Sequence, residues 1–134
     1  MTRYAIDAPT ALRIVRDERP IPAAHALVGP SLLRSHVLSA LYRDVRAGRL
    51  DERAARADLD GLAALKIRLL GDRVSRATAF RLAELLDWDD TALAEYLAVA
   101  TLQADVLIAA DDALVRGAEG LIAVAAYDDL FRGS

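Results

Sequence analysis

The chain predicts an α/β fold in which a mainly parallel, five-stranded sheet is covered by helices on both faces. Short apolar runs alternate with amphipathic stretches along the whole chain, which is the pattern of parallel strands joined by helices. In addition, 54% of the 134 residues are hydrophobic, so the chain can bury a core of its own without disulfides. We therefore expect one domain over residues 1–134.

The first half of the chain is expected to contain three strands and three helices. A short apolar run precedes Pro9, and proline suits the first turn of a helix. Ser31 is placed to cap the next helix, which ends at Gly48. The amphipathic stretch that follows predicts a third helix, and the apolar run after it a third strand. The expected strands are residues 3–6, 26–28 and 66–70, and the expected helices are residues 9–16, 31–48 and 51–65.

The second half is expected to add three helices and two strands. Leu93, Tyr96, Leu97 and Ala100 share one helical face, which predicts an amphipathic helix. Two further apolar runs flank a short helix near the end of the chain. The expected helices are residues 74–86, 91–103 and 112–118, and the expected strands are residues 106–109 and 121–125.

Composition excludes several classes of protein. The chain has no cysteine, so it has neither disulfides nor a thiolate site, which fits a cytoplasmic protein. No apolar run approaches the roughly 20 residues that cross a bilayer. The net charge is −3, and Lys66 is the only lysine among 17 cationic side chains. This net charge is not typical of a nucleic-acid-binding protein, although arginine-rich faces can still bind phosphate or carboxylate.

Two aspartates stand where buried strands are expected to end. Asp7 follows the first strand and Asp111 follows the fourth. Ligands of open parallel sheets bind outside the carboxyl ends of the strands, near the point where strand order reverses. Paired carboxylates without cysteine favour a hard cation such as Mg²⁺ or Mn²⁺. Asp7 and Asp111 are therefore the predicted metal ligands.

Four segments, in order along the chain, resemble the PIN-domain ribonucleases, above all the VapC-type toxins of bacterial toxin–antitoxin (VapBC) systems. The segments are residues 4–7, 28–41, 94–100 and 104–114. The resemblance implies a three-layer α/β/α PIN-like domain and a Mg²⁺- or Mn²⁺-dependent endoribonuclease that acts on RNA. It also implies a cognate antitoxin protein that blocks the site, and a homodimer.

The family places four acids in its pocket, and this chain matches two of them. The first corresponds to Asp7 and the fourth to Asp111, while the second falls on His36 and the third on Leu93. Histidine can bind Mn²⁺ or act as a general base near neutral pH, or it can be a half-buried histidine in a site that has lost its acid. Asp90, three residues before Leu93, is a candidate to position water, or it caps the following helix.

Each aspartate has a structural alternative, and so do the arginines. Asp7 can be only a helix cap, and Asp111 or Asp112 can cap the helix that follows them. Two arginine sets can hold RNA phosphates or an acidic partner, or can simply be solvated; they are Arg43, Arg46 and Arg49, and Arg73, Arg76 and Arg81. Two functions result. The first is a metal-dependent endoribonuclease toxin that uses Asp7, Asp111, His36 and Asp90. The second is a catalytically impaired PIN-like module that binds RNA or an antitoxin-like protein.

Overall fold

Five parallel strands form the central sheet of the computed structural model, which describes residues 1–133. The strand order is β3-β2-β1-β4-β5, and all four pairings are parallel. The elements are β1 (Thr2–Ile6), α1 (Ala8–Asp17), β2 (His25–Pro30), α2 (Leu33–Arg46), α3 (Glu52–Ala64), β3 (Arg68–Leu70), α4 (Arg73–Leu85), α5 (Ala92–Gln103), β4 (Val106–Ile108), α6 (Asp112–Ala118), β5 (Ala123–Val124) and the 3-10 helix η1 (Tyr127–Phe131).

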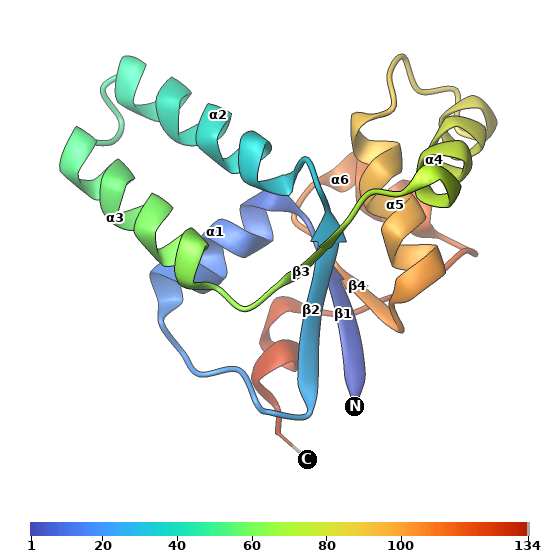
Figure 1. The fold of residues 1–134 in the computed structure, drawn as a ribbon, viewed down its shortest axis with the longest axis horizontal. Helices are drawn as coiled ribbons and strands as arrows, with labels where there is room; N and C mark the ends of the chain where they lie inside the picture. The colour runs from blue at the N-terminus through green and yellow to red at the C-terminus, as the bar shows by residue number, and fades with distance from the viewer. Residues whose placement is uncertain (134) are drawn as a thin grey trace.

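Helices cover both faces of this sheet, so the predicted three-layer α/β/α architecture is confirmed (Figure 1). Helices α1, α2 and α3 pack on one another on one face, and α4, α5 and α6 form the other layer. Helix α5 contacts β1 and β2 directly and is buried over Tyr96–Ala100. The centre of the core is formed by side chains with almost no exposed surface, among them Ile6, Leu97 and Leu107.

The strand order reverses between β1 and β4. From β1 the chain moves outward through β2 to β3, and it then crosses back to β4 on the other side of β1. Such a reversal opens a crevice at the carboxyl ends of the two strands, because the connections leave toward opposite layers. Asp7 directly follows β1, and Asp111 follows β4 after Ala109 and Ala110, so both lie at the carboxyl ends of these strands, as the sequence predicted.

Three local predictions are wrong. Ser31 does not cap α2; the cap position is Leu32, without a side-chain hydrogen bond, and the Ser31 N–H donates to the Leu70 carbonyl at 2.9 Å. Lys66 precedes β3 instead of opening it. Strand β5 has only two residues, both exposed, instead of the five expected, because its only neighbour in the described sheet, β4, has just three residues and pairs with it over two positions.

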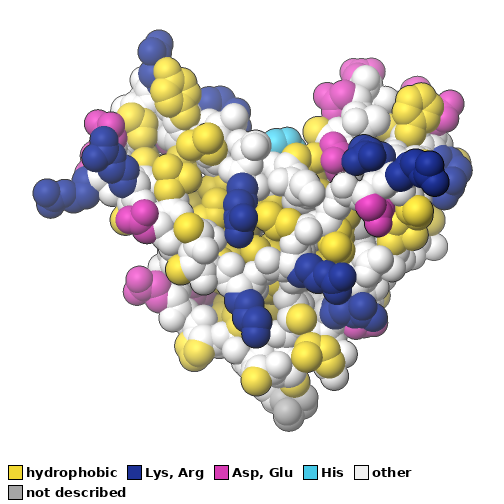
Figure 2. All heavy atoms as spheres, viewed as in Figure 1, with side chains coloured by type: hydrophobic (Ala, Val, Ile, Leu, Met, Phe, Trp, Pro, Cys, Tyr) yellow, Lys and Arg dark blue, Asp and Glu magenta, His cyan; other side chains and the backbone are white. Residues whose placement is uncertain are grey.

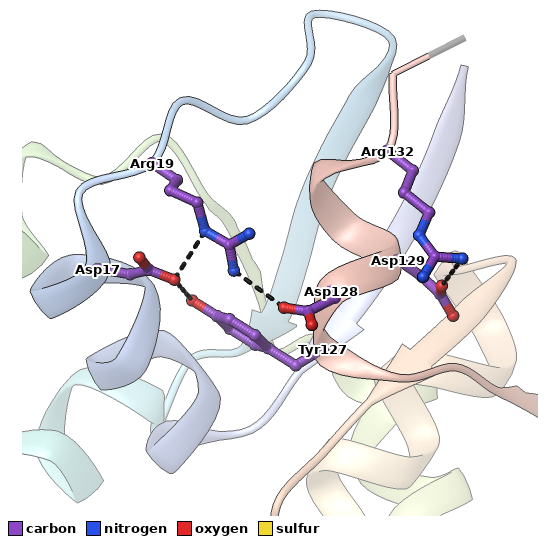
Figure 3. Close-up of polar contacts among 6 residues, drawn as sticks. All are labelled: Asp17, Arg19, Tyr127, Asp128, Asp129 and Arg132. Atoms are coloured by element: carbon purple, nitrogen blue, oxygen red, sulfur yellow. Dashed lines mark hydrogen bonds and ion pairs between the residues drawn. The ribbon is translucent and has the colours of Figure 1, made fainter.

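The C-terminal segment packs back on α1. Leu130 of η1 has no exposed surface, and Arg19 bonds to Asp17 at 3.0 Å while the Tyr127 hydroxyl donates to Asp17 at 2.9 Å (Figure 3). The hydrogen bond from Tyr127 holds the pKa of Asp17 below its ordinary value. These contacts fix the position of the loop that follows α1. Among residues 1–133, no helix combines the length and the apolar character needed to cross a membrane.

Candidate functional site

A cavity of about 490 Å³ lies beside the carboxyl ends of β1 and β4. Figure 2 shows the corresponding notch in the surface, between α2 on one side and α4 and α5 on the other. The polar lining comes from Asp7, His36, Ser39, Arg43, Tyr96 and Asp111, and the remaining lining residues, which include Leu93, are apolar. The structure therefore brings Asp7, His36, Leu93 and Asp111, the four positions singled out by the resemblance, around one cavity.

The carboxylate of Asp7 is bonded to the backbone on both oxygens. Oδ1 accepts the Thr10 N–H at 3.0 Å and so caps α1. Oδ2 accepts the N–H groups of Ala110 and Asp111 at 2.9 and 3.0 Å. Because Asp7 is only 2% exposed, these three amides are the main partners of its charge. Asp7 thus ties the start of α1 to the connection between β4 and α6.

Asp111 is more open to the cavity than Asp7. Its Oδ1 accepts the Leu114 N–H at 3.0 Å and caps α6, while Oδ2 accepts no hydrogen bond from the part of the chain that the structure describes. The residue is half-buried, whereas Asp112 is exposed and lies outside the cavity lining. Of the two aspartates, Asp111 is therefore the one whose carboxylate can contact a ligand in the cavity.

His36 pairs with a tyrosine instead of an acid. Its Nδ1 lies 2.9 Å from the Tyr96 hydroxyl, and the two rings stack with their centroids 5.5 Å apart. Burial, reinforced by the charge of Asp7, raises the pKa of Tyr96 well above its ordinary value, so the hydroxyl keeps its proton. The arrangement that satisfies this buried hydroxyl has Tyr96 donating to Nδ1, with the ring proton of His36 on Nε2.

The surroundings favour the neutral form of His36. Burial lowers the pKa of His36, the charge of Arg43 lowers it further, and the charge of Asp90 opposes both. A neutral imidazole that already accepts a hydrogen bond through Nδ1 has only Nε2 left to offer the cavity. His36 is thus suited to hydrogen bonding with a ligand more than to holding a positive charge.

This preference predicts a pH-dependent stability. The unfolded His36 binds its proton near the ordinary value of 6.5 and the folded one only at lower pH, so the unfolded state binds more protons between these two pKa values. The stability due to neutral His36 is therefore present above pH 6.5 and is lost as the pH falls through the folded pKa. Urea unfolding between about pH 8 and pH 5 should show this loss in the wild type and not in His36→Gln.

A charge variant checks the cause of that pH dependence. Arg43→Gln removes one of the two effects that lower the pKa of His36, so the loss of stability at low pH should be smaller than in the wild type. An identical pH profile in wild type, His36→Gln and Arg43→Gln would show that another group titrates.

Of the remaining predicted site residues, Leu93 lines the cavity and Asp90 does not. Leu93 is half-buried. Asp90 is exposed and outside the lining, and its Oδ1 accepts the Ala92 N–H at 3.0 Å. The expected alternative, that Asp90 caps α5, is wrong, because the cap position is Thr91 and makes no side-chain capping bond. Asp90 lies one residue earlier, and its bond to Ala92 closes a turn ahead of the helix. Asp90 acts on the site only through its charge on His36.

The two arginine sets do not combine into one basic surface at the cavity. Arg43 alone among them lines it. Arg49 is paired with Asp44 at 2.9 Å, and Arg76 donates to the Gly71 carbonyl at 3.2 Å. Tyr96 is the site residue that sequence reasoning missed, because it was assigned only to the core. Its place three residues after Leu93, on the same helical face, was the available signal.

The donor set does not fit a resident divalent cation. Within residues 1–133, no group of three or more acidic, histidine or cysteine side chains is close enough to share an ion. Asp7 is nearly buried and bonded to three amides, and Leu93 offers no donor. Two carboxylates can hold Mg²⁺ weakly when substrate phosphates complete its shell, but here only Asp111 has an oxygen free for that purpose.

Comparison with known proteins agrees with the fold. No family model matches the chain, and no curated protein matches it. A similar solved structure is the crystal structure of PAE2754 from Pyrobaculum aerophilum, with a TM-score of 0.74 and 22% sequence identity. The match covers 97% of this chain and 93% of that one. At this identity the likeness establishes the α/β/α fold and nothing about activity.

Proposed function

We propose that the protein is a PIN-like module whose notch binds a protein partner and does not carry out metal-dependent RNA cleavage. Of the two functions expected from the sequence, this is the second, with a protein as the ligand. The contacts of Asp7 support the loss of cleavage, because a carboxylate engaged by three amides is poorly available to a metal. The stacking of His36 on Tyr96 at the second acidic position supports it as well.

The observation that carries the proposal is the distribution of exposed apolar side chains. Within residues 1–133, nine large apolar side chains are well exposed, and five of these lie on α2 and α4. These helices stand on opposite sides of the notch (Figure 1). The five are Leu38, Tyr42, Val74, Phe80 and Leu85. Exposed aromatic and aliphatic groups beside arginines are typical of protein interfaces.

Charge favours a protein over RNA. The chain carries a net charge of −3, and the accessible carboxylate of Asp111 adds a negative charge to the cavity lining. Nucleic-acid interfaces are instead strongly positive, because phosphates must be neutralised. Arg43 is the one arginine in the cavity lining, and it suits a single carboxylate or amide from a partner chain.

The test uses the polypeptide encoded by the reading frame that adjoins this protein's gene. Co-expression should give a stable complex that survives chelation of divalent metals. Tyr42→Asp and Phe80→Asp should each weaken the complex about tenfold or more, because exposed aromatic residues often dominate binding energy. Leu102→Asp is the matched control, since Leu102 is 42% exposed at the far end of α5.

Two outcomes would overturn the proposal. One is the absence of a complex with this polypeptide, or a complex that both Tyr42→Asp and Phe80→Asp leave intact. The other is cleavage of total RNA by the wild type with Mg²⁺ or Mn²⁺ that Asp111→Asn abolishes. Asp111→Asn suits this purpose because asparagine caps a helix as well as aspartate does, so the fold is preserved.

A further inference from the structure

A second cavity, of about 790 Å³, lies near the amino ends of the strands, away from the notch. It is bounded by the end of α1, the loop to β2, the start of β2, and the segment that joins α3 to β3. We propose that this cavity binds an amphiphile with one acyl chain and one carboxylate head, that is, a fatty acid. The proposal is independent of the function assigned to the notch.

The walls of the cavity are suited to an acyl chain. Most of the lining residues are apolar, and Val15, Ile21, Leu65 and Ile67 keep part of their surface exposed. The volume lies within the roughly 300–1,000 Å³ of typical small-molecule sites, which are mainly apolar with a few polar groups. Each methylene that moves from water to such walls gains free energy.

The cavity is positively charged in an otherwise acidic protein. The positive charge lies at the border formed by Lys66 and Arg68, because the third cation of the lining, Arg19, is paired with Asp17 and Asp128. The whole chain has a net charge of −3. Figure 2 shows Lys and Arg side chains beside apolar surface in the region of β3. This local excess of positive charge complements an anionic head group at the mouth of an apolar cavity.

Two of these cations are available to a ligand. Arg19 is held by Asp17 and Asp128, both at 3.0 Å (Figure 3). The guanidinium of Arg19 also lies over the ring of Phe131. Lys66 and Arg68 take part in none of the ion pairs formed among residues 1–133. They are exposed and lie two residues apart, so both can reach one carboxylate.

The rigid surroundings favour a small ligand over a partner chain. The contacts of Arg19 and Tyr127 fix the loop after α1 on one side. On the other side, α1 and α3 pack closely at Gly61, where an added Cβ would collide with the side chain of Val15. Contacts within the protein therefore fix both borders of the cavity, so its shape suits a small ligand that enters it.

The experiment is calorimetric titration of the full chain with octanoate, decanoate and dodecanoate below their micelle concentrations. We expect one site, and binding that tightens about tenfold for every two methylenes added. Dodecyltrimethylammonium, with the same chain and a cationic head, should bind at least about tenfold more weakly than dodecanoate. The melting temperature should rise with dodecanoate.

Variants separate the contribution of the carboxylate head group to binding from that of the acyl chain. The double variant Lys66→Gln with Arg68→Gln should weaken the binding of dodecanoate about tenfold. Ala64→Trp should abolish this binding by filling the cavity. Arg53→Gln, an exposed arginine of α3 outside the cavity, should leave it unchanged. Equal affinity for the anionic and cationic amphiphiles, full binding by the double variant, or binding only to anionic lipid vesicles would each overturn the proposal.

Discussion

Replacing Asp7 by alanine should lower the free energy of unfolding by about 3–5 kcal/mol, the largest effect of any single aspartate in the chain. The carboxylate accepts three backbone N–H groups and is 2% exposed. Alanine would leave all three donors without their partner and would remove the cap of α1. Urea unfolding at neutral pH measures this loss directly.

Conservative variants show whether the lost hydrogen bonds of Asp7 cause this loss of stability. Asp7→Asn keeps one acceptor oxygen but turns an NH₂ group toward backbone donors, so its loss should lie between the wild type and Asp7→Ala. Asp111→Asn should change stability by less than about 0.5 kcal/mol, because asparagine retains the capping bond to Leu114. If Asp7→Ala and Asp111→Ala are equally mild, Asp7 has no special structural role and is again free to act as a metal ligand.

Introducing acids at positions 36 and 93 should create a metal site if these positions correspond to acids of the PIN-domain ribonucleases that the sequence resembles. The double variant His36→Glu with Leu93→Asp places carboxylates at positions 36, 93 and 111 around one cavity. Without metal the variant should lose about 2–4 kcal/mol, because it loses the apolar contacts of Leu93 and brings like charges together. Added Mn²⁺ should restore about 2.7 kcal/mol at a concentration 100 times its Kd.

Two measurements check this second prediction. Thermal unfolding with and without Mn²⁺ should show a metal-dependent rise in Tm in the double variant that is much larger than in the wild type. RNA cleavage should also be faster in the double variant. If the Tm of the double variant does not change with Mn²⁺ and its rate of RNA cleavage equals that of the wild type, positions 36 and 93 do not correspond to the acidic positions of the PIN-domain ribonucleases.

The sequence predicted most of the fold because its strands and helices have clear patterns. The strand β1 and the helix α6 follow from an apolar run and from capping residues, and the alternation of elements predicted the parallel sheet. The length of β5 was overestimated because Leu121 and Ala125 are apolar, whereas its short partner β4 offers pairing over only two positions. Ser31 was wrongly assigned as a cap because strand pairing engages its backbone instead.

The candidate site was predicted in position but not in chemistry. Spacing after two strands was enough to bring Asp7 and Asp111 to one cavity. Hydrogen bonds between residues about a hundred positions apart, such as those from Ala110 and Asp111 to Asp7, leave no signal in the sequence. The contact between His36 and Tyr96 depends on how α2 and α5 lie in space, which local patterns do not determine.

We expect that this cavity does not bind a divalent metal, and titration of the wild type with Mn²⁺ tests this expectation most directly. Mn²⁺ is the suitable probe because it accepts both carboxylate and imidazole ligands. We predict no saturable heat up to millimolar Mn²⁺, and the same result for Asp111→Asn. Saturable binding to one site in the wild type that Asp111→Asn removes would contradict this expectation and would favour the metal-dependent ribonuclease instead.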